Sequence, residues 1–209
     1  RLMLLAFRNG RILTDRGFES GKTLLVRDGR IEGIVNHLVG ADHTVDLEGG
    51  DLVPGFIDTQ VNGGGGVLFN ENPSVETTPA IGEAHRQFGT TGFLPTLISD
   101  DLHVVEQAIV AVRDAIARRV PGVLGIHIEG PFLNHDRRGV HDPAKLRSLD
   151  TKAVELLAMP HGGVTMVTLA PEKTTPALIR ALDAAGVVVS AGHTDATFEE
   201  LQPALANGL

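Results

Sequence analysis

From residue 52 onward, short apolar runs alternate with amphipathic stretches, and glycine or proline stands at most of the junctions. The apolar runs predict strands, and the amphipathic stretches predict helices because their apolar residues recur every three or four positions. The strands are expected at residues 52–58, 92–98, 123–128, 164–169 and 187–190. The helices are expected after a cap at Thr78, over 102–116, over 151–159, and after caps at Thr175 and Thr197. This alternation indicates a parallel α/β sheet.

Two architectures satisfy this pattern, an open doubly wound sheet and a (β/α)8 barrel. Residues 52–209 have room for about five units at roughly 30 residues each. A complete barrel needs about 250 residues, so a barrel would be incomplete after its fifth strand. Before residue 52 we expect short strands only, with a hairpin at Asp28-Gly29 between 23–27 and 30–35. The expected domains are therefore 1–51, built of strands, and 52–209.

Composition narrows the function classes. Asp and Glu outnumber Lys and Arg by 26 to 18, which argues against a nucleic-acid partner because such proteins need a clustered basic face. No apolar run reaches the ~18 residues of a membrane span. With no cysteine, disulfides, thiolate metal sites and cysteine nucleophiles are excluded. The composition fits a reducing compartment, and we expect a cytoplasmic protein.

Polar clusters follow three of the predicted strands, at residues 58–62, 127–132 and 190–195. Glu129 and His193 offer a carboxylate and an imidazole, which a catalytic Zn2+ or a similar ion accepts. His141 lies in the loop after the third strand. One such residue alone at a strand end is more often a capping or hydrogen-bonding group than a ligand, whereas together at equivalent strand ends these residues indicate a metal site. The glycines at 63–66 lack a phosphate-binding signature, and we expect them to let the backbone approach a ligand.

Three motifs resemble the N-acetylglucosamine-6-phosphate deacetylases of the amidohydrolase superfamily. They are Pro-Gly-Phe-Ile-Asp-Thr-Gln at 54–60, His-Ile-Glu-Gly-Pro-Phe at 127–132, and Ser-Ala-Gly-His at 190–193; Thr-Thr-Gly-Phe-Leu-Pro-Thr at 90–96 and Thr-Leu-Ala-Pro-Glu at 168–172 agree with them. The resemblance implies a (β/α)8 TIM barrel with a small β-sandwich built from both chain ends. It implies metal-dependent hydrolysis of N-acetylglucosamine 6-phosphate to glucosamine 6-phosphate and acetate, a step of amino-sugar catabolism.

By the same resemblance, Glu129 and His193 are metal ligands and His141 contacts the substrate near the scissile carbonyl. Gln60 stands where many amidohydrolases have the second histidine of a His-x-His pair. Because an amide is a poor ligand, we expect one divalent ion, with Gln60 marking a vestigial second-metal position. Zn2+ is the expected ion, with Fe2+, Co2+ or Mn2+ as alternatives.

The resemblance places the third metal ligand, a histidine after the sixth strand, beyond Leu209. It places the general-base aspartate there as well, so no catalytic residue is assigned within this sequence. We therefore expect these 209 residues alone to have no useful turnover. The resemblance also implies a homodimer.

Rival functions remain open from the sequence. Another amidohydrolase, dihydroorotase-like or adenine-deaminase-like, would usually carry the His-x-His pair that Gln60 interrupts. A non-catalytic sugar-phosphate binder or structural remnant is a further rival, which metal analysis and acetate release from the amino-sugar phosphate would distinguish from the deacetylase. A doubly wound nucleotide-binding domain would need the phosphate fingerprint that this sequence lacks.

Overall fold

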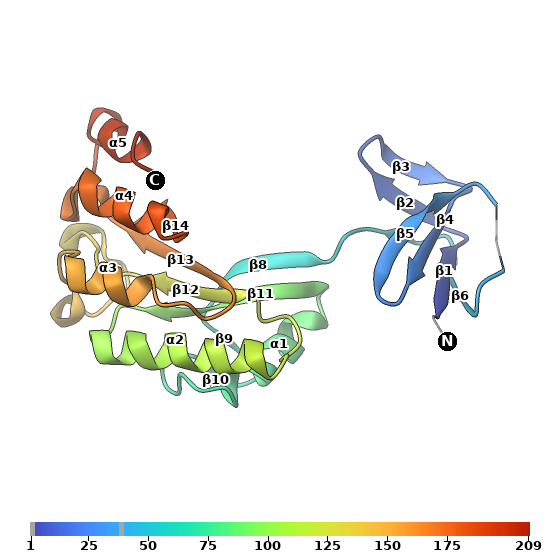
Figure 1. Ribbon diagram of the computed structural model, residues 1–209, viewed down its shortest axis with the longest axis horizontal. Coiled ribbons are helices and arrows are strands. Elements are labelled where there is room, and N and C mark those ends of the chain that lie inside the picture. Colours follow the sequence, from blue (N-terminus) through green and yellow to red (C-terminus); the bar gives the residue numbers. More distant parts are fainter. Residues whose placement is uncertain (1–2, 38–39) are drawn as a thin grey trace. The chain divides into compact units, whose positions relative to one another are not determined.

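The computed structural model describes residues 3–37 and 40–209. The chain divides into two compact units, Arg1–Gly55 and Phe56–Leu209, shown in Figure 1. None of the described helices has the length and hydrophobicity that crossing a lipid bilayer requires.

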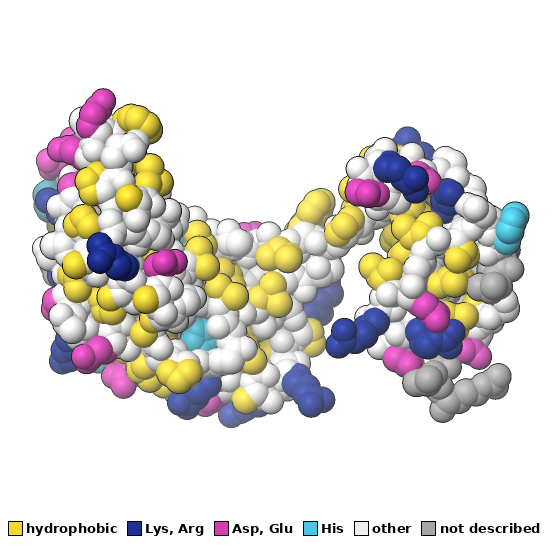
Figure 2. Space-filling view, turned by 45° about the horizontal axis from the view of Figure 1, so that its top comes forward, with side chains coloured by type: hydrophobic (Ala, Val, Ile, Leu, Met, Phe, Trp, Pro, Cys, Tyr) yellow, Lys and Arg dark blue, Asp and Glu magenta, His cyan; other side chains and the backbone are white. Residues whose placement is uncertain are grey.

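The first unit consists of two small sheets with strand orders β5-β4-β1-β6 and β3-β2-β7. The expected hairpin is confirmed, because Asp28 and Gly29 both have positive φ, as a tight two-residue turn requires. Several apolar side chains of this unit are exposed to solvent, and Ile31 is 72 % exposed. Figure 2 shows hydrophobic side chains gathered on the visible face of the unit. The strands are β1 (Leu4–Arg8), β2 (Arg11–Thr14), β3 (Gly17–Ser20), β4 (Thr23–Arg27), β5 (Arg30–Val35), β6 (His43–Asp46) and β7 (Asp51–Leu52).

The second unit is built on a five-stranded parallel sheet with the order β14-β13-β12-β11-β8. Each new strand joins the same edge, so right-handed crossovers place the connecting helices on one face and leave the other for a barrel interior. A doubly wound sheet would reverse direction at a switch point. The barrel prediction is therefore confirmed, as a curled half-barrel. Figure 1 shows α2, α3 and α4 in a row along the sheet.

The elements of the second unit have the following bounds. The strands are β8 (Phe56–Val61), β9 (Gly63–Gly64), β10 (Val67–Leu68), β11 (Thr90–Ile98), β12 (Gly125–Glu129), β13 (Val164–Leu169) and β14 (Val188–Ala191). The α-helices are α1 (Thr77–Arg86), α2 (Leu102–Ala117), α3 (Thr151–Leu157), α4 (Pro176–Ala184) and α5 (Phe198–Leu205), and the 3-10 turns are η1 (His135–Arg137), η2 (Pro143–Lys145) and η3 (Pro171–Lys173).

Two sequence expectations at the start of this unit are wrong. The strand expected from Leu52 begins at Phe56, because Asp51–Leu52 pairs with β2 as strand β7. Thr78 does not cap α1 but lies inside it, fully buried, and its hydroxyl donates to the Val75 carbonyl at 2.8 Å. By contrast, Thr175 caps α4. The cap at Thr197 is also confirmed, and it forms a reciprocal capping box with Glu200 at the start of α5.

The core lies between the sheet and its helices. Its largest fully buried side chains include Phe69, Phe93 and Phe132. On the opposite face, the polar residues Thr96, His127 and Thr168 are buried together: His127 Nδ1 lies 3.2 Å from Thr96 Oγ1, and His127 Nε2 lies 2.8 Å from Thr168 Oγ1. Three adjacent strands are thus joined by one imidazole just below the strand ends.

Close contact between β12 and β13 depends on Gly125. A Cβ atom at this position would lie 1.9 Å from the Val164 carbonyl oxygen. We expect Gly125→Ala to lower the free energy of unfolding by about 3 kcal/mol, because the strands would have to separate. The urea midpoint, followed by circular dichroism, measures this loss. Gly33→Ala is the control, since nothing lies within 4 Å of its added Cβ; equal midpoints for the two variants would contradict this packing.

Candidate metal centre

The segments that follow β8, β12 and β14 meet at one rim of the half-barrel, because parallel strands end at the same edge. A cavity of about 340 Å³ opens there. It is lined by Gln60, Asn62, Leu68, Asn70, Ile98, Glu129, Val140, His141 and His193. The structure thus brings together all four predicted site residues, Gln60, Glu129, His141 and His193.

Glu129 and His193 are in direct contact. Glu129 Oε1 lies 3.0 Å from His193 Nε2. The other ring nitrogen of His193, Nδ1, lies 2.9 Å from the Arg137 carbonyl oxygen. Because a carbonyl oxygen can only accept, Nδ1 must carry the proton, and in the neutral ring Nε2 then has only a lone pair. Two acceptors therefore face each other at 3.0 Å, an arrangement that needs a cation or a second proton between them.

The backbone around His193 is specialised for this position. His193 has φ +51°, in the left-handed region, which costs a non-glycine residue on the order of 1–3 kcal/mol. Before it, Gly192 leaves no room for a side chain, because a Cβ there would lie 2.5 Å from Thr168 Cγ2. The bonds around the loop must hold the imidazole in place against this strain.

His141 presents the opposite chemistry to the cavity. Its Nδ1 accepts a hydrogen bond from the Ser99 backbone N–H at 3.2 Å, and the Ser99 hydroxyl lies 2.7 Å away. Burial lowers the pKa of His141 against the opposing effect of Glu129, so the ring is neutral at pH 7. A neutral ring that accepts at Nδ1 carries its proton on Nε2. Nε2 lies on the Glu129 side of the ring, 4.0 Å from Glu129 Oε1.

The three side chains fit a divalent ion with unequal roles. Glu129, His141 and His193 each offer an atom within 4.8 Å of the others. A ligand nitrogen must be unprotonated. In the tautomer with the proton on Nδ1, His193 Nε2 meets this condition, whereas His141 Nε2 carries the proton of its ring. Glu129 and His193 can therefore hold an ion, whereas His141 can donate a hydrogen bond to a group bound beside it.

Gln60 lies on the cavity wall, and two of the glycines that follow it contact a helix. A Cβ on Gly64 would lie 2.9 Å from His85 Nε2, and one on Gly65 would lie 2.9 Å from the Ala80 carbonyl oxygen. His85 and Ala80 both belong to α1. Gly64 and Gly65 therefore let the β9–β10 hairpin pack against this helix.

Sequence reasoning missed two residues that support the cavity. Ser99 is one of them, because its N–H and hydroxyl contact His141, 42 residues away. Asn70 fastens the end of β11, because its side chain accepts from the Ile98 N–H at 2.9 Å. No local pattern could have found either residue, since both contacts join distant parts of the chain.

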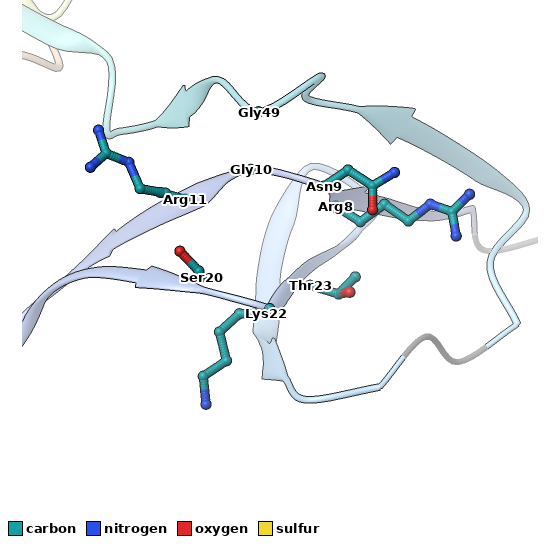
Figure 3. A pocket seen from close by; sticks show the side chains of 9 residues that line it. Arg8, Asn9, Gly10, Arg11, Ser20, Lys22, Thr23 and Gly49 are labelled. Atoms are coloured by element: carbon teal, nitrogen blue, oxygen red, sulfur yellow. The ribbon is translucent and has the colours of Figure 1, made fainter.

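A larger cleft, of about 510 Å³, lies in the first unit and is basic. Figure 3 shows Arg8, Arg11 and Lys22 around it. Two of these cations already have anionic partners: Arg11 Nε lies 2.6 Å from Asp51, and Lys22 Nζ lies 3.5 Å from Glu19. The cleft contains none of the predicted site residues, so the cavity at the barrel rim is the better candidate.

Comparison with known proteins places these observations in a family. The sequence profile of the amidohydrolase family matches residues 52–207. The chain is 44 % identical to N-acetylgalactosamine-6-phosphate deacetylase of Shewanella sp. (strain ANA-3), over 99 % of this chain and 53 % of that protein. It is 37 % identical to N-acetylglucosamine-6-phosphate deacetylase of Haemophilus influenzae, over 79 % of this chain and 43 % of that protein.

A solved structure agrees with these relatives. The crystal structure of N-acetylglucosamine-6-phosphate deacetylase from Pasteurella multocida superposes with a TM-score of 0.92 at 34 % identity. The match covers 98 % of this chain and 55 % of that one. The chain thus spans about half the length of the relatives it matches.

The ligand assignment predicts a loss of metal. In the whole protein, Glu129→Gln removes the anionic ligand and His193→Ala removes the imidazole lone pair. Each should lower the content from about one divalent ion per chain to nearly none, because a catalytic ion depends on about three protein ligands. Elemental analysis by mass spectrometry after gel filtration measures the content. Glu106→Gln, at an exposed position on α2, should keep the ion; a Glu129→Gln protein that also keeps it would refute the assignment.

Proposed function

Because this chain belongs to the amidohydrolase family, we propose that the whole protein hydrolyses the acetamide of N-acetylglucosamine 6-phosphate. The products are glucosamine 6-phosphate and acetate: the amide C–N bond breaks, the acyl carbon gains an oxygen from water, and the amine gains a proton. The observation that carries the proposal is the facing pair of Glu129 Oε1 and His193 Nε2, 3.0 Å apart beside the N–H of His141.

We propose that Glu129 and His193 hold one divalent ion, with Zn2+ as the first choice because carboxylate and imidazole are common zinc ligands. When bound, such an ion supplies Lewis-acid chemistry, polarising a carbonyl oxygen and acidifying a water molecule. Fe2+, Co2+ and Mn2+ accept the same ligands. The family resemblance assigns a third ligand and the proton-transferring aspartate to residues outside this sequence, and we propose that they complete the site. We propose that Gln60, a neutral amide on the cavity wall, marks a vestigial second-metal position.

His141 is proposed to act on the substrate directly. Its Nε2–H would donate to the amide carbonyl oxygen, and this bond strengthens as negative charge develops on that oxygen. Ser99 matters here because its N–H keeps the acceptor nitrogen of His141 turned away from the cavity. The deep burial of His141 excludes water from the opposite side of the ring.

A second substrate has a specific observation in its favour. The Shewanella relative, at 44 % identity, is named for N-acetylgalactosamine 6-phosphate. This sugar differs from the first substrate only in the configuration at C4, and its scissile acetamide is the same. Parallel assays with both sugar phosphates, compared by kcat/KM, distinguish the two. The resemblance also implies a homodimer, which light scattering of the whole protein tests.

The proposed role of His141 predicts a loss of turnover without a loss of metal. His141→Ala in the whole protein should lower kcat for acetate release by about 100- to 1000-fold, as for the removal of one oxyanion donor. Its metal content should stay at the wild-type level, because His141 Nε2 is protonated and is not a ligand. His103→Ala, an exposed position on α2, is the matched control. Unchanged turnover in His141→Ala, or a loss of the ion, would contradict the donor role.

A further inference from the structure

Glu172 joins the three loops that follow β12, β13 and β14. It lies in η3, directly after β13. Its Oε1 accepts from Asn134 Nδ2 at 2.8 Å and from the Asp195 backbone N–H at 2.9 Å. Its Oε2 accepts from the hydroxyl of Thr194. One carboxylate therefore holds side-chain and backbone donors from both neighbouring loops.

Both loops that Glu172 contacts also hold His193. The Asn134 backbone N–H donates to the His193 carbonyl oxygen at 3.0 Å. In the same loop, the Arg137 carbonyl accepts from His193 Nδ1 at 2.9 Å. Thr194 and Asp195 follow His193 directly along the chain. The contacts of Glu172 therefore bracket His193 from two sides.

The carboxylate of Glu172 is suited to this role. Partial burial raises the pKa of Glu172. The hydrogen bonds from Thr194, Asp195 and Asn134 together lower it by more, so the pKa lies below its ordinary value. The group is thus ionised at pH 7, and charge-assisted bonds are stronger than neutral ones. These bonds oppose the strain of the left-handed conformation of His193, at φ +51°.

We propose that Glu172 is a positioning residue, which locks the loops around His193 and keeps its Nε2 directed at the Glu129 carboxylate. The inference rests on the proposed function, because it takes His193 as a metal ligand. Groups that orient a ligating histidine affect metal affinity although they do not touch the ion. Glu172 is expected to act in this indirect way.

The test compares Glu172→Ala and Glu172→Gln with wild type in the whole protein. The dissociation constant for Zn2+ is measured by competition with a chromophoric chelator, and thermal melting monitors folding. We expect Glu172→Ala to weaken Zn2+ binding by about 10- to 100-fold. Glu172→Gln should weaken it by only about threefold, because its amide oxygen still accepts from Asn134 and Asp195 through neutral bonds. Glu155→Ala, at an exposed position on α3, should bind like wild type.

A spectroscopic signature separates positioning from a general loss of stability. With Co2+ in place of Zn2+, the visible absorption bands of the Co2+-loaded Glu172→Ala protein should shift relative to wild type. Those of Glu155→Ala should not shift. The shift in Glu172→Ala is expected even if its melting temperature equals that of wild type. Thr194→Val removes the hydroxyl that donates to Glu172 and accepts from the Ala196 N–H, so its loss of affinity should be smaller than that of Glu172→Ala, and smaller in the Glu172→Ala background than in wild type. Full additivity would show that Thr194 acts separately and would overturn the proposal.

The outcomes for Glu172 and for the proposed function can be told apart. Equal Zn2+ dissociation constants and identical Co2+ spectra for wild type and Glu172→Ala would overturn the inference alone. A wild-type protein that binds Zn2+ but releases no acetate would defeat the proposed function, and the ratio of dissociation constants would still decide the role of Glu172. A wild-type protein that binds no ion would overturn both.

Discussion

The site depends on two acceptor atoms held face to face. Glu129 Oε1 and His193 Nε2 lie 3.0 Å apart, and each would repel the other without a positive charge between them. The sheet produces this contact because Glu129, Thr168 and Ser190 are paired in one row across β12, β13 and β14. His193 stands three residues beyond that row, where the chain can turn back across the strand ends. Any slip of register would separate the two side chains.

Two histidines in the same cavity have different roles because different backbone groups contact them. The carbonyl oxygen of Arg137 accepts a hydrogen bond from His193 Nδ1–H, so in the neutral ring Nε2 carries only a lone pair. A backbone N–H of Ser99 occupies His141 Nδ1, which places the proton on Nε2. One histidine thus serves as a metal ligand and the other as a hydrogen-bond donor, and the residue type alone could not distinguish these two roles.

The sequence predicted the features that are local or periodic. The strand at Val164–Leu169 has the expected bounds, and the helix caps expected at Thr175 and Thr197 are both present. The sequence-based predictions failed where the place of a residue depends on contacts with distant parts of the chain. Thr78, for example, was expected to cap α1 but is buried inside the helix. The cavity residues were found from their strand ends, whereas Ser99 and Glu172 act through contacts that no spacing reveals.

Anomalous diffraction at the zinc absorption edge, from crystals of the whole active protein, tests the central claim most directly. The account predicts one peak at the barrel rim, about 2.0–2.2 Å from a Glu129 carboxylate oxygen and from His193 Nε2, with His141 outside the coordination shell. A peak bonded to His141 rather than His193, or an active crystal with no metal between Glu129 and His193, would contradict it.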